Sequence, residues 1–183
     1  DVVMLPMDLM GTLALDGGLS GSFTPLGRVE IGLFKKPEAT APDINSVPKL
    51  AAAMKGASVV FYTDPATGSM QARMNGQLLA RPDFAGVHGQ PIMGDAEPAL
   101  KRGDGDAKAM GLGLIHGEHD PTNRPTANPY LVGQLPPELG MHMDMATAIN
   151  ARSTDPTDAA AFIEFATSPP MRPVWAHKGV NRY

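Results

Sequence analysis

Residues 57–80 read ASVVFYTDPATGSMQARMNGQLLA, and this stretch decides the type of fold. Residues 57–63 are mainly β-branched and aromatic, a composition that is typical of a buried strand. The polar segment DPATGS that follows is a loop. A helix is then predicted over residues 69–80, because apolar side chains recur there at helical spacing. The side chains expected on its buried face are Met70, Met74, Leu78 and Leu79.

The same alternation of strand and helix patterns extends to both sides of this stretch. Further strands are expected at residues 1–5, 28–36, 87–93, 110–115, 130–132 and 141–149. Further helices are expected at residues 7–15, 46–54, 95–102 and 155–166, and from Ser168 to near Gly179. The alternation predicts an α/β fold with mostly parallel sheets and flanking helices. Ligands of such folds bind at the carboxyl ends of strands, which directs attention to the loops after Thr63, Met93 and Ile115.

The composition narrows the classes of partner. The chain has 183 residues, no cysteine and a formal net charge of −4. This charge argues against a nucleic-acid surface and against an anionic membrane surface, since both need clustered Lys and Arg. The lack of cysteine excludes disulfides, thiolate metal sites and thiol catalysis. No apolar run approaches the roughly 20 residues that span a bilayer, so no membrane insertion is expected.

The first residues of the chain have the character of a strand interior. The sequence begins DVVML and shows no signal peptide. A native chain rarely begins inside a strand. We therefore expect that a segment upstream of Asp1 is missing from this sequence.

The loop after Thr63 leads into a predicted helix, and the start of a helix favours an anion. Its first N–H groups lack acceptors within the helix, and the helix dipole attracts negative charge. Gly68 lets a ligand approach the backbone closely, and Ser69 or Thr67 can donate a hydroxyl proton. The alternative interpretation is an ordinary turn in which Ser69 caps the helix.

The loop after Met93 also precedes a predicted helix. Asp95 fits either a simple N-cap or a functional carboxylate at this position. If an anion binds here, the expected donor is the backbone N–H of Ala96 or Glu97.

The loop after Ile115 carries the sequence HGEHD at residues 116–120. A His-x-x-His pair with acidic neighbours can chelate a metal, but Gly117 and the strand end do not favour that geometry. We expect no metal or other cofactor, and we expect His116 to contact a ligand as a neutral donor. The enzyme alternative uses His116 with Glu118 or Asp95 as an acid–base pair, although none of the common catalytic signatures occurs.

Three stretches together form a recognisable pattern. The first is SVVFYTDPATGS (58–69), a strand followed by a DPxxG loop. The second is GLGLIHG (111–117), and the third is the run from 130 to 180, with VGQLPPEL, AAFIEFATSPP and WAHKG in that order. The pattern covers nearly the whole chain and resembles the molybdate-binding-protein-like family of bacterial ABC-transporter solute-binding proteins.

The resemblance implies a two-lobed periplasmic-binding-protein-like fold of type II. It assigns residues 1–27 and 128–183 to the first lobe and residues 28–127 to the second. Residues 117–129 would cross between the lobes. The N-terminal βαβ segment of the family has no counterpart here, so the first lobe would be partial.

The resemblance also implies a ligand site. Its contacts would come from Gly68, Ser69 and Met70, with Thr67 as a further hydroxyl, from Asp95 and Ala96, and from His116, which replaces a tyrosine of molybdate binders. The implied function is the binding component of an ABC importer. It would close its lobes around a small anion, either molybdate, tungstate, another oxyanion or a small carboxylate, and present it to an ABC permease from a periplasmic or extracytoplasmic location. An enzyme on the same scaffold, or a structural or signalling fragment, remains an alternative.

Overall fold

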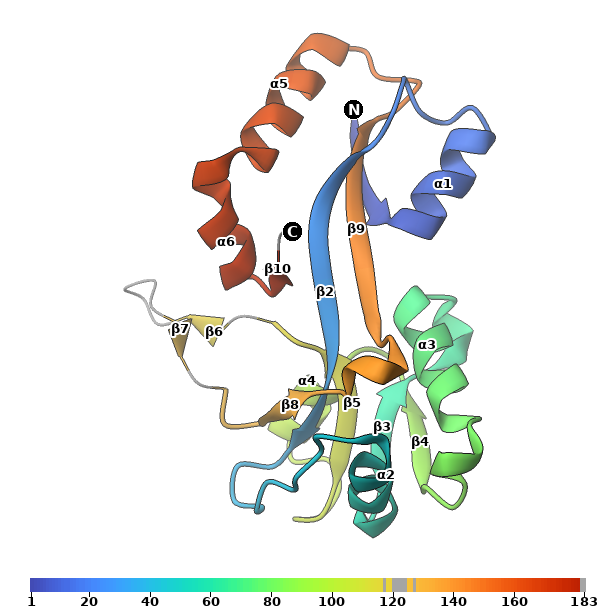
Figure 1. The fold of residues 1–183 in the computed structure, drawn as a ribbon, viewed down its shortest axis with the longest axis vertical. Helices are drawn as coiled ribbons and strands as arrows, with labels where there is room; N and C mark the ends of the chain where they lie inside the picture. Colours follow the sequence, from blue (N-terminus) through green and yellow to red (C-terminus); the bar gives the residue numbers. More distant parts are fainter. Residues whose placement is uncertain (117, 120–124, 127, 182–183) are drawn as a thin grey trace. The chain divides into compact units, whose positions relative to one another are not determined.

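The computed structural model describes residues 1–116, 118–119, 125–126 and 128–181, and the chain divides into two compact units. Unit 1 consists of Asp1–Val29, His116–Thr126 and His142–Tyr183. Unit 2 consists of Glu30–Ile115 and Ala127–Met141. Figure 1 shows the course of the chain through both units. The sequence-based division places residues 128–141 in the first lobe, whereas contacts group them with unit 2.

A mixed sheet forms the centre of unit 2, with its strands in the order β2–β5–β3–β4. β3 (Val60–Thr63) pairs in parallel with β4 (Gly89–Ile92) and with β5 (Met110–Leu114). β2 (Thr24–Lys35), which contributes residues to both units, is antiparallel to β5 and to β8 (Leu131–Gln134). The β8 pairing explains why this part of the chain belongs to unit 2.

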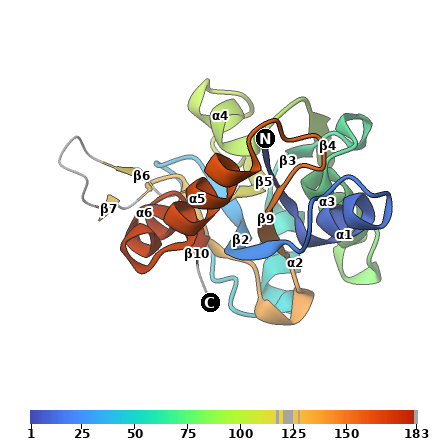
Figure 2. The ribbon, with the colours of Figure 1, turned by 90° about the horizontal axis from the view of Figure 1, so that it is seen from above.

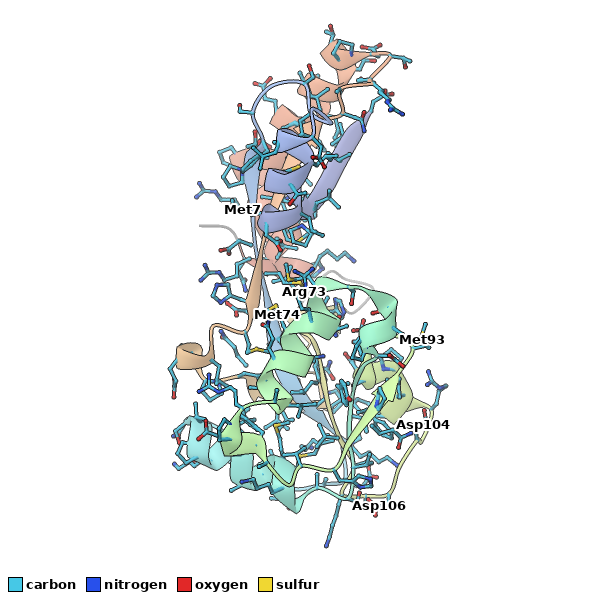
Figure 3. The ribbon with its side chains drawn as sticks, turned by 90° about the vertical axis from the view of Figure 1, so that its right-hand side faces the viewer. Met7, Arg73, Met74, Met93, Asp104 and Asp106 are labelled. Atoms are coloured by element: carbon cyan, nitrogen blue, oxygen red, sulfur yellow. The ribbon has the colours of Figure 1, made fainter. Side chains whose placement is uncertain are left out.

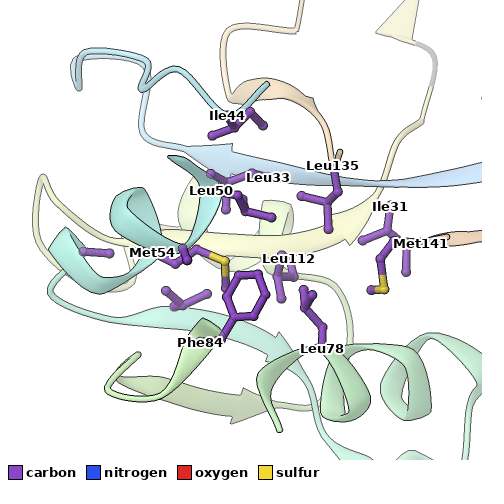
Figure 4. Packing of buried hydrophobic residues seen from close by; sticks show 13 residues of the cluster. Ile31, Leu33, Ile44, Leu50, Met54, Leu78, Phe84, Leu112, Leu135 and Met141 are labelled. Atoms are coloured by element: carbon purple, nitrogen blue, oxygen red, sulfur yellow. The ribbon is translucent and has the colours of Figure 1, made fainter. Parts of the chain in front are cut away.

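Helices cover both faces of this sheet. α2 (Val47–Gly56) and α3 (Met70–Leu79) supply side chains to one cluster of buried residues, and α4 (Ala96–Lys101) supplies side chains to another. The labelled members of the first cluster in Figure 4 are Ile31, Leu33, Ile44, Leu50, Met54, Leu78, Phe84, Leu112, Leu135 and Met141. Val60 belongs to the first cluster and Phe61 to the second, because successive strand residues point to opposite faces.

Short turns of helix complete unit 2. They are η1 (Pro65–Thr67), η2 (Pro82–Phe84) and η3 (Pro137–Leu139), and each has a proline at its start. Proline fits this place because its ring fixes φ and its missing N–H is not needed there.

The segment that returns to unit 2 at Asn128 is held by side chains of that unit. Asn128 Nδ2 donates to Glu97 Oε1 at 2.8 Å. The buried Lys35 ammonium donates to the carbonyls of Lys36, Pro37 and Pro129 at 3.1, 3.3 and 3.4 Å. The Lys35 backbone N–H donates to Tyr130 O at 2.7 Å. Backbone carbonyls therefore take the place of a carboxylate partner around this ammonium.

Unit 1 is built on an antiparallel pair of strands. β1 (Val2–Pro6) pairs with β9 (His142–Ile149), with Val2 opposite Ile149. α1 (Met7–Leu15) and α5 (Pro156–Thr167) flank this pair on opposite sides, as Figures 1 and 2 both show. The chain continues through η4 (Pro169–Met171) and α6 (Arg172–His177) to β10 (Val180–Asn181), which pairs with β2. β6 (Glu118–His119) and β7 (Pro125–Thr126) pair with each other.

The α/β class predicted from the sequence is confirmed, and so are most of its elements. α1 has the predicted bounds, and the strands and helices expected from residue 28 to residue 177 are present with small shifts. The expectation of mostly parallel sheets is wrong: of the described pairings, only those of β3 with β4 and β5 are parallel. β2 also begins earlier than expected, at Thr24. Of the predicted crossover at 117–129, residues 117, 120–124 and 127 lie outside the described residues.

Candidate functional site

Two strand-to-helix junctions leave the same edge of the unit 2 sheet. β3 and β4 are parallel, with Thr63 opposite Ile92, so their carboxyl ends lie side by side. The junctions are also joined directly. The Asp64 N–H donates to Ile92 O at 2.9 Å, and Thr63 Oγ1 donates to Gly94 O at 3.1 Å. The structure thus brings together the first two loops that the sequence singled out.

The first junction is a tight turn that ends in a capped helix. Gly68 has φ 65°, a left-handed conformation that glycine adopts without strain, and there is open space beside its Cα. Ser69 Oγ accepts a hydrogen bond from the Ala72 N–H at 3.2 Å, so Ser69 is the N-cap of α3. This much agrees with the ordinary-turn interpretation.

The same junction retains donors that a ligand can use. Thr67 Oγ1 donates its proton to Asp64 O at 2.8 Å, so in its 3.1 Å contact with Ser69 Oγ the serine is the donor. Ser69 can donate to a ligand instead by rotating its hydroxyl away from Thr67. Helix geometry leaves the N–H groups of Met70 and Gln71 without an acceptor inside α3. Thr67, Gly68 and Ser69 are exposed and Met70 is half-buried.

The second junction places a buried alanine against glycines of the sheet. Ala96 is fully buried at the start of α4. A Cβ added at Gly111 would lie closer than 3.0 Å to the Cβ of Ala96, and one added at Gly113 would lie 3.3 Å from the Phe34 ring. The glycines of β5 therefore allow α4 to approach the sheet closely.

Asp95 is at the N-cap position of α4 but does not cap it. Its side chain makes no hydrogen bond to the helix. Asp95 Oδ1 instead accepts a hydrogen bond from Gln71 Nε2 of α3 at 2.7 Å. The simple N-cap interpretation of Asp95 is therefore wrong, and its carboxylate links the two junctions.

The buried face of α3 differs from the sequence prediction. Its buried residues are Gln71, Ala72, Asn75 and Leu78. Met70 and Met74 are only partly buried, because the helix turns its amide-bearing side toward the sheet. Neither Gln71 nor Asn75 was expected to matter. The sequence did contain a signal for them: Gln71 and Asn75 are four residues apart, and Gln71 and Leu78 are seven apart, so all three lie on one face of a helix.

Met93 and Asp106 lie toward opposite ends of unit 2, with Asp104 between them in the view of Figure 3. Met93 follows β4 at the site edge, and its side chain is exposed. Asp106 precedes β5 at the other edge, where Ser58 Oγ and the Lys108 N–H hydrogen bond to its carboxylate. These bonds lower the pKa of Asp106. The turn that carries Asp104 and Asp106 is therefore not part of the candidate site.

His116 is the remaining predicted contact. It is exposed, follows β5 by two residues and is grouped with unit 1, whereas the other six candidate residues belong to unit 2. In the part of the chain that the structure describes, no three His, Cys, Asp or Glu residues are arranged to hold a metal ion. Asp120 of the HGEHD sequence lies outside that part.

Comparisons with known proteins give a likeness of structure. No protein-family model and no curated protein matches the chain. The substrate-binding domain of a putative molybdenum ABC transporter from Clostridium difficile superposes with a TM-score of 0.70 at 12% identity, over 100% of this chain and 77% of that one. The periplasmic molybdate-binding protein of Azotobacter vinelandii gives 0.66 at 13% identity, over 98% and 77%.

Other neighbours have different ligands in their names. A putative phosphate ABC transporter substrate-binding protein from Clostridium perfringens, with bound phosphate, gives a TM-score of 0.60 at 12% identity, over 100% of this chain and 79% of that one. Among the described helices, none is long and apolar enough to cross a membrane.

Likeness at identities of 12–13% concerns the fold alone. The chain has the α/β fold of periplasmic substrate-binding proteins.

Proposed function

We propose that this protein is the solute-binding component of an ABC importer and that it binds a small anion outside the cytoplasm. The observation that carries the proposal is the pair of junctions at one edge of unit 2. Each junction leads into a helix, and the Thr63–Gly94 and Gln71–Asp95 hydrogen bonds connect the two junctions. Backbone donors suit a ligand that must bind firmly and still leave, because no buried countercharge has to be separated from it.

In this proposal the ligand contacts come from seven residues. They are Thr67, Gly68, Ser69, Met70, Asp95, Ala96 and His116. Ser69 would donate its hydroxyl, and Met70 and Ala96 their backbone N–H groups. The ligand is molybdate, tungstate, another oxyanion or a small carboxylate, and the ligand-bound protein is recognised by an ABC permease.

The proposal includes a further segment that packs on unit 1, additional to these 183 residues. β1 is apolar throughout, which is typical of a central strand, yet it is last in the strand order, and among the described residues it pairs only with β9. Phe165 of α5 is 60% exposed and Leu15 of α1 is 90% exposed. The molybdate-binding neighbours also have longer chains, of which this one covers 77%. A strand–helix–strand segment beside β1 would cover these apolar surfaces.

Thermal unfolding in the presence of anions tests the function. A ligand at 100 times its Kd stabilises the native protein by about 2.7 kcal/mol. For a chain of this size that raises the Tm by about 5–11 °C. The panel consists of molybdate, tungstate, sulfate, phosphate, acetate and lactate, each titrated against the purified chain.

A pair of serine variants assigns any shift to the proposed site. Ser69→Ala should remove most of the ligand-induced shift, because it deletes a hydroxyl donor and the cap of α3. Ser46→Ala is the matched control, because Ser46 occupies the N-cap position of α2 without a side-chain cap bond. A panel in which no anion raises the Tm of the unmodified chain would overturn the proposal.

A further inference from the structure

Met93 differs in exposure from every other methionine of the chain. The sequence contains twelve methionines, and all of them lie among the described residues. Met93 is 77% exposed, whereas each of the others is buried or half-buried, and Met10 and Met54 are 0% exposed. The chain has no cysteine, so no thiolate competes with a thioether for an oxidant. An oxidant in solution therefore reaches the sulfur of Met93 more readily than that of any other residue.

The backbone around Met93 is fixed while its side chain is not packed. The carbonyl of Ile92 accepts from the Asp64 N–H at 2.9 Å, and the carbonyl of Gly94 accepts from Thr63 Oγ1 at 3.1 Å. Among the described residues, neither cluster of buried side chains in unit 2 includes Met93. A polar group added to this side chain thus displaces no packed neighbour and stays in contact with water, and the hydrogen bonds on both sides hold the chain in place.

The same change would be costly at the buried methionines. A sulfoxide is polar, and burial of a polar group without a hydrogen-bond partner destabilises the folded state. Met10 and Met54 lie in clusters of buried apolar residues, where an added oxygen has to find both space and a partner. Oxidation at Met93 is therefore the one that the folded chain tolerates best.

We infer that Met93 is a modification site of this protein, which peroxides oxidise selectively and reversibly to the sulfoxide while the fold is retained. A lone pair of the sulfur attacks one oxygen of the peroxide, so that an S–O bond forms and the O–O bond breaks. The sulfur is oxidised by two electrons and the peroxide is reduced. With hydrogen peroxide, the proton of the transferred oxygen passes to the departing hydroxide, which leaves as water. This chemistry involves no bound anion and is independent of the proposed function.

Limited treatment of the 183-residue chain with hydrogen peroxide, followed by intact-mass and peptide mass spectrometry, tests the inference. We expect the first added oxygen on Met93, at a rate at least about tenfold that of any other methionine. Met74 lies in the same tryptic peptide, residues 74–101, and is half-buried. Fragment ions of this one peptide therefore compare an exposed thioether directly with a half-buried one.

Two leucine variants assign the rate to its residue. Met93→Leu keeps an apolar side chain of similar size and should lower the initial rate of oxidation by about half or more, because it removes the fastest site. Met74→Leu is the matched control and should leave that rate unchanged. Thermal melts of both variants before treatment confirm that they are folded.

The singly oxidised chain tests whether the modification is tolerated and reversible. Its Tm should lie within about 2 °C of that of the untreated chain, as for a change on the protein surface. A mixture of the A-type and B-type methionine sulfoxide reductases, one for each sulfoxide epimer, should remove the added oxygen. A first oxygen on any methionine other than Met93, an unchanged rate in Met93→Leu, a loss of the folded state on single oxidation, or a sulfoxide that the reductases leave in place would each refute the inference.

Discussion

Replacing Gly111 by alanine tests whether the sheet really holds α4 by close contact. The new methyl group would lie closer than 3.0 Å to the Cβ of Ala96, which is fully buried. That Cβ is attached directly to the helix backbone, so no side-chain rotation relieves the overlap. α4 must therefore move away from β5, and the N–H groups of Ala96 and Glu97 must move with it.

The size of the effect follows from the cost of overpacking. Adding a methyl group to a close-packed interior destabilises a protein by about 1–3 kcal/mol. Each kcal/mol changes the Tm of a chain of this size by about 2–4 °C. Gly111→Ala should thus lower the Tm by about 2–12 °C, as measured by circular dichroism. It should also weaken the binding of any anion at this edge, as measured by calorimetry.

Gly76→Ala is the matched control for this prediction. Gly76 lies inside α3, its φ is not positive, and nothing lies within 4 Å of an added Cβ. Alanine in a helix interior is favoured over glycine by about 0.5–1 kcal/mol, so the Tm should rise by about 1–4 °C. If Gly111→Ala unfolds at or above the temperature of the unmodified chain, the close contact of α4 with β5 does not exist as described.

Three other substitutions should give measurable changes in stability. Asn75→Leu should raise stability by about 1–3 kcal/mol in urea unfolding, because Asn75 is 0% exposed and neither of its amide atoms has a partner among the described residues; a loss instead would mean that the amide is satisfied. Lys35→Met should lower the free energy of unfolding by about 1–3 kcal/mol, because it leaves without a donor the carbonyls that now accept from the ammonium. An unchanged midpoint of urea unfolding would contradict this. Ser58→Ala should reduce the stability that Asp106 contributes above its pKa. That pKa is lowered below its ordinary value of 3.8, chiefly by the Ser58 hydroxyl, so the contribution is present above that pH and is lost as the pH falls through the folded pKa. Melting curves from pH 5 to pH 2 should therefore converge for Ser58→Ala and the unmodified chain at the acid end and differ above it.

The sequence predicted the elements of this protein better than their directions. Residues 57–80 gave a strand, a loop and a helix that the structure confirms, because local composition and spacing determine them. The direction of β2 against β5 depends on pairing between residues about 80 positions apart, such as Ile31 and Leu114, and no local pattern records it. The expectation of parallel strands therefore failed there.

The candidate site was predictable in part for the same reason. Gly68 and Ser69 were identified because a turn and a cap are local signals. The Gln71–Asp95 hydrogen bond joins residues 24 positions apart, and its formation depends on how α3 is rotated on the sheet. The sequence placed the methionines of α3 inward, where amides are found instead. Tertiary packing, and not helical spacing alone, chose the buried face.

The way in which the chain leaves and rejoins unit 2 makes that unit separable. Ile115 ends the outgoing segment, and Asn128 to Tyr130 anchor the returning one to Glu97 and Lys35. Ile115 of the outgoing segment and Leu131 of the returning segment both have side-chain atoms within 3.0 Å of the position that a Cβ on Gly32 would occupy. The two segments therefore lie next to the same residue of β2. A short glycine–serine bridge between Ile115 and Asn128 should therefore yield unit 2 as a separate fragment that carries both helix starts and can be studied alone.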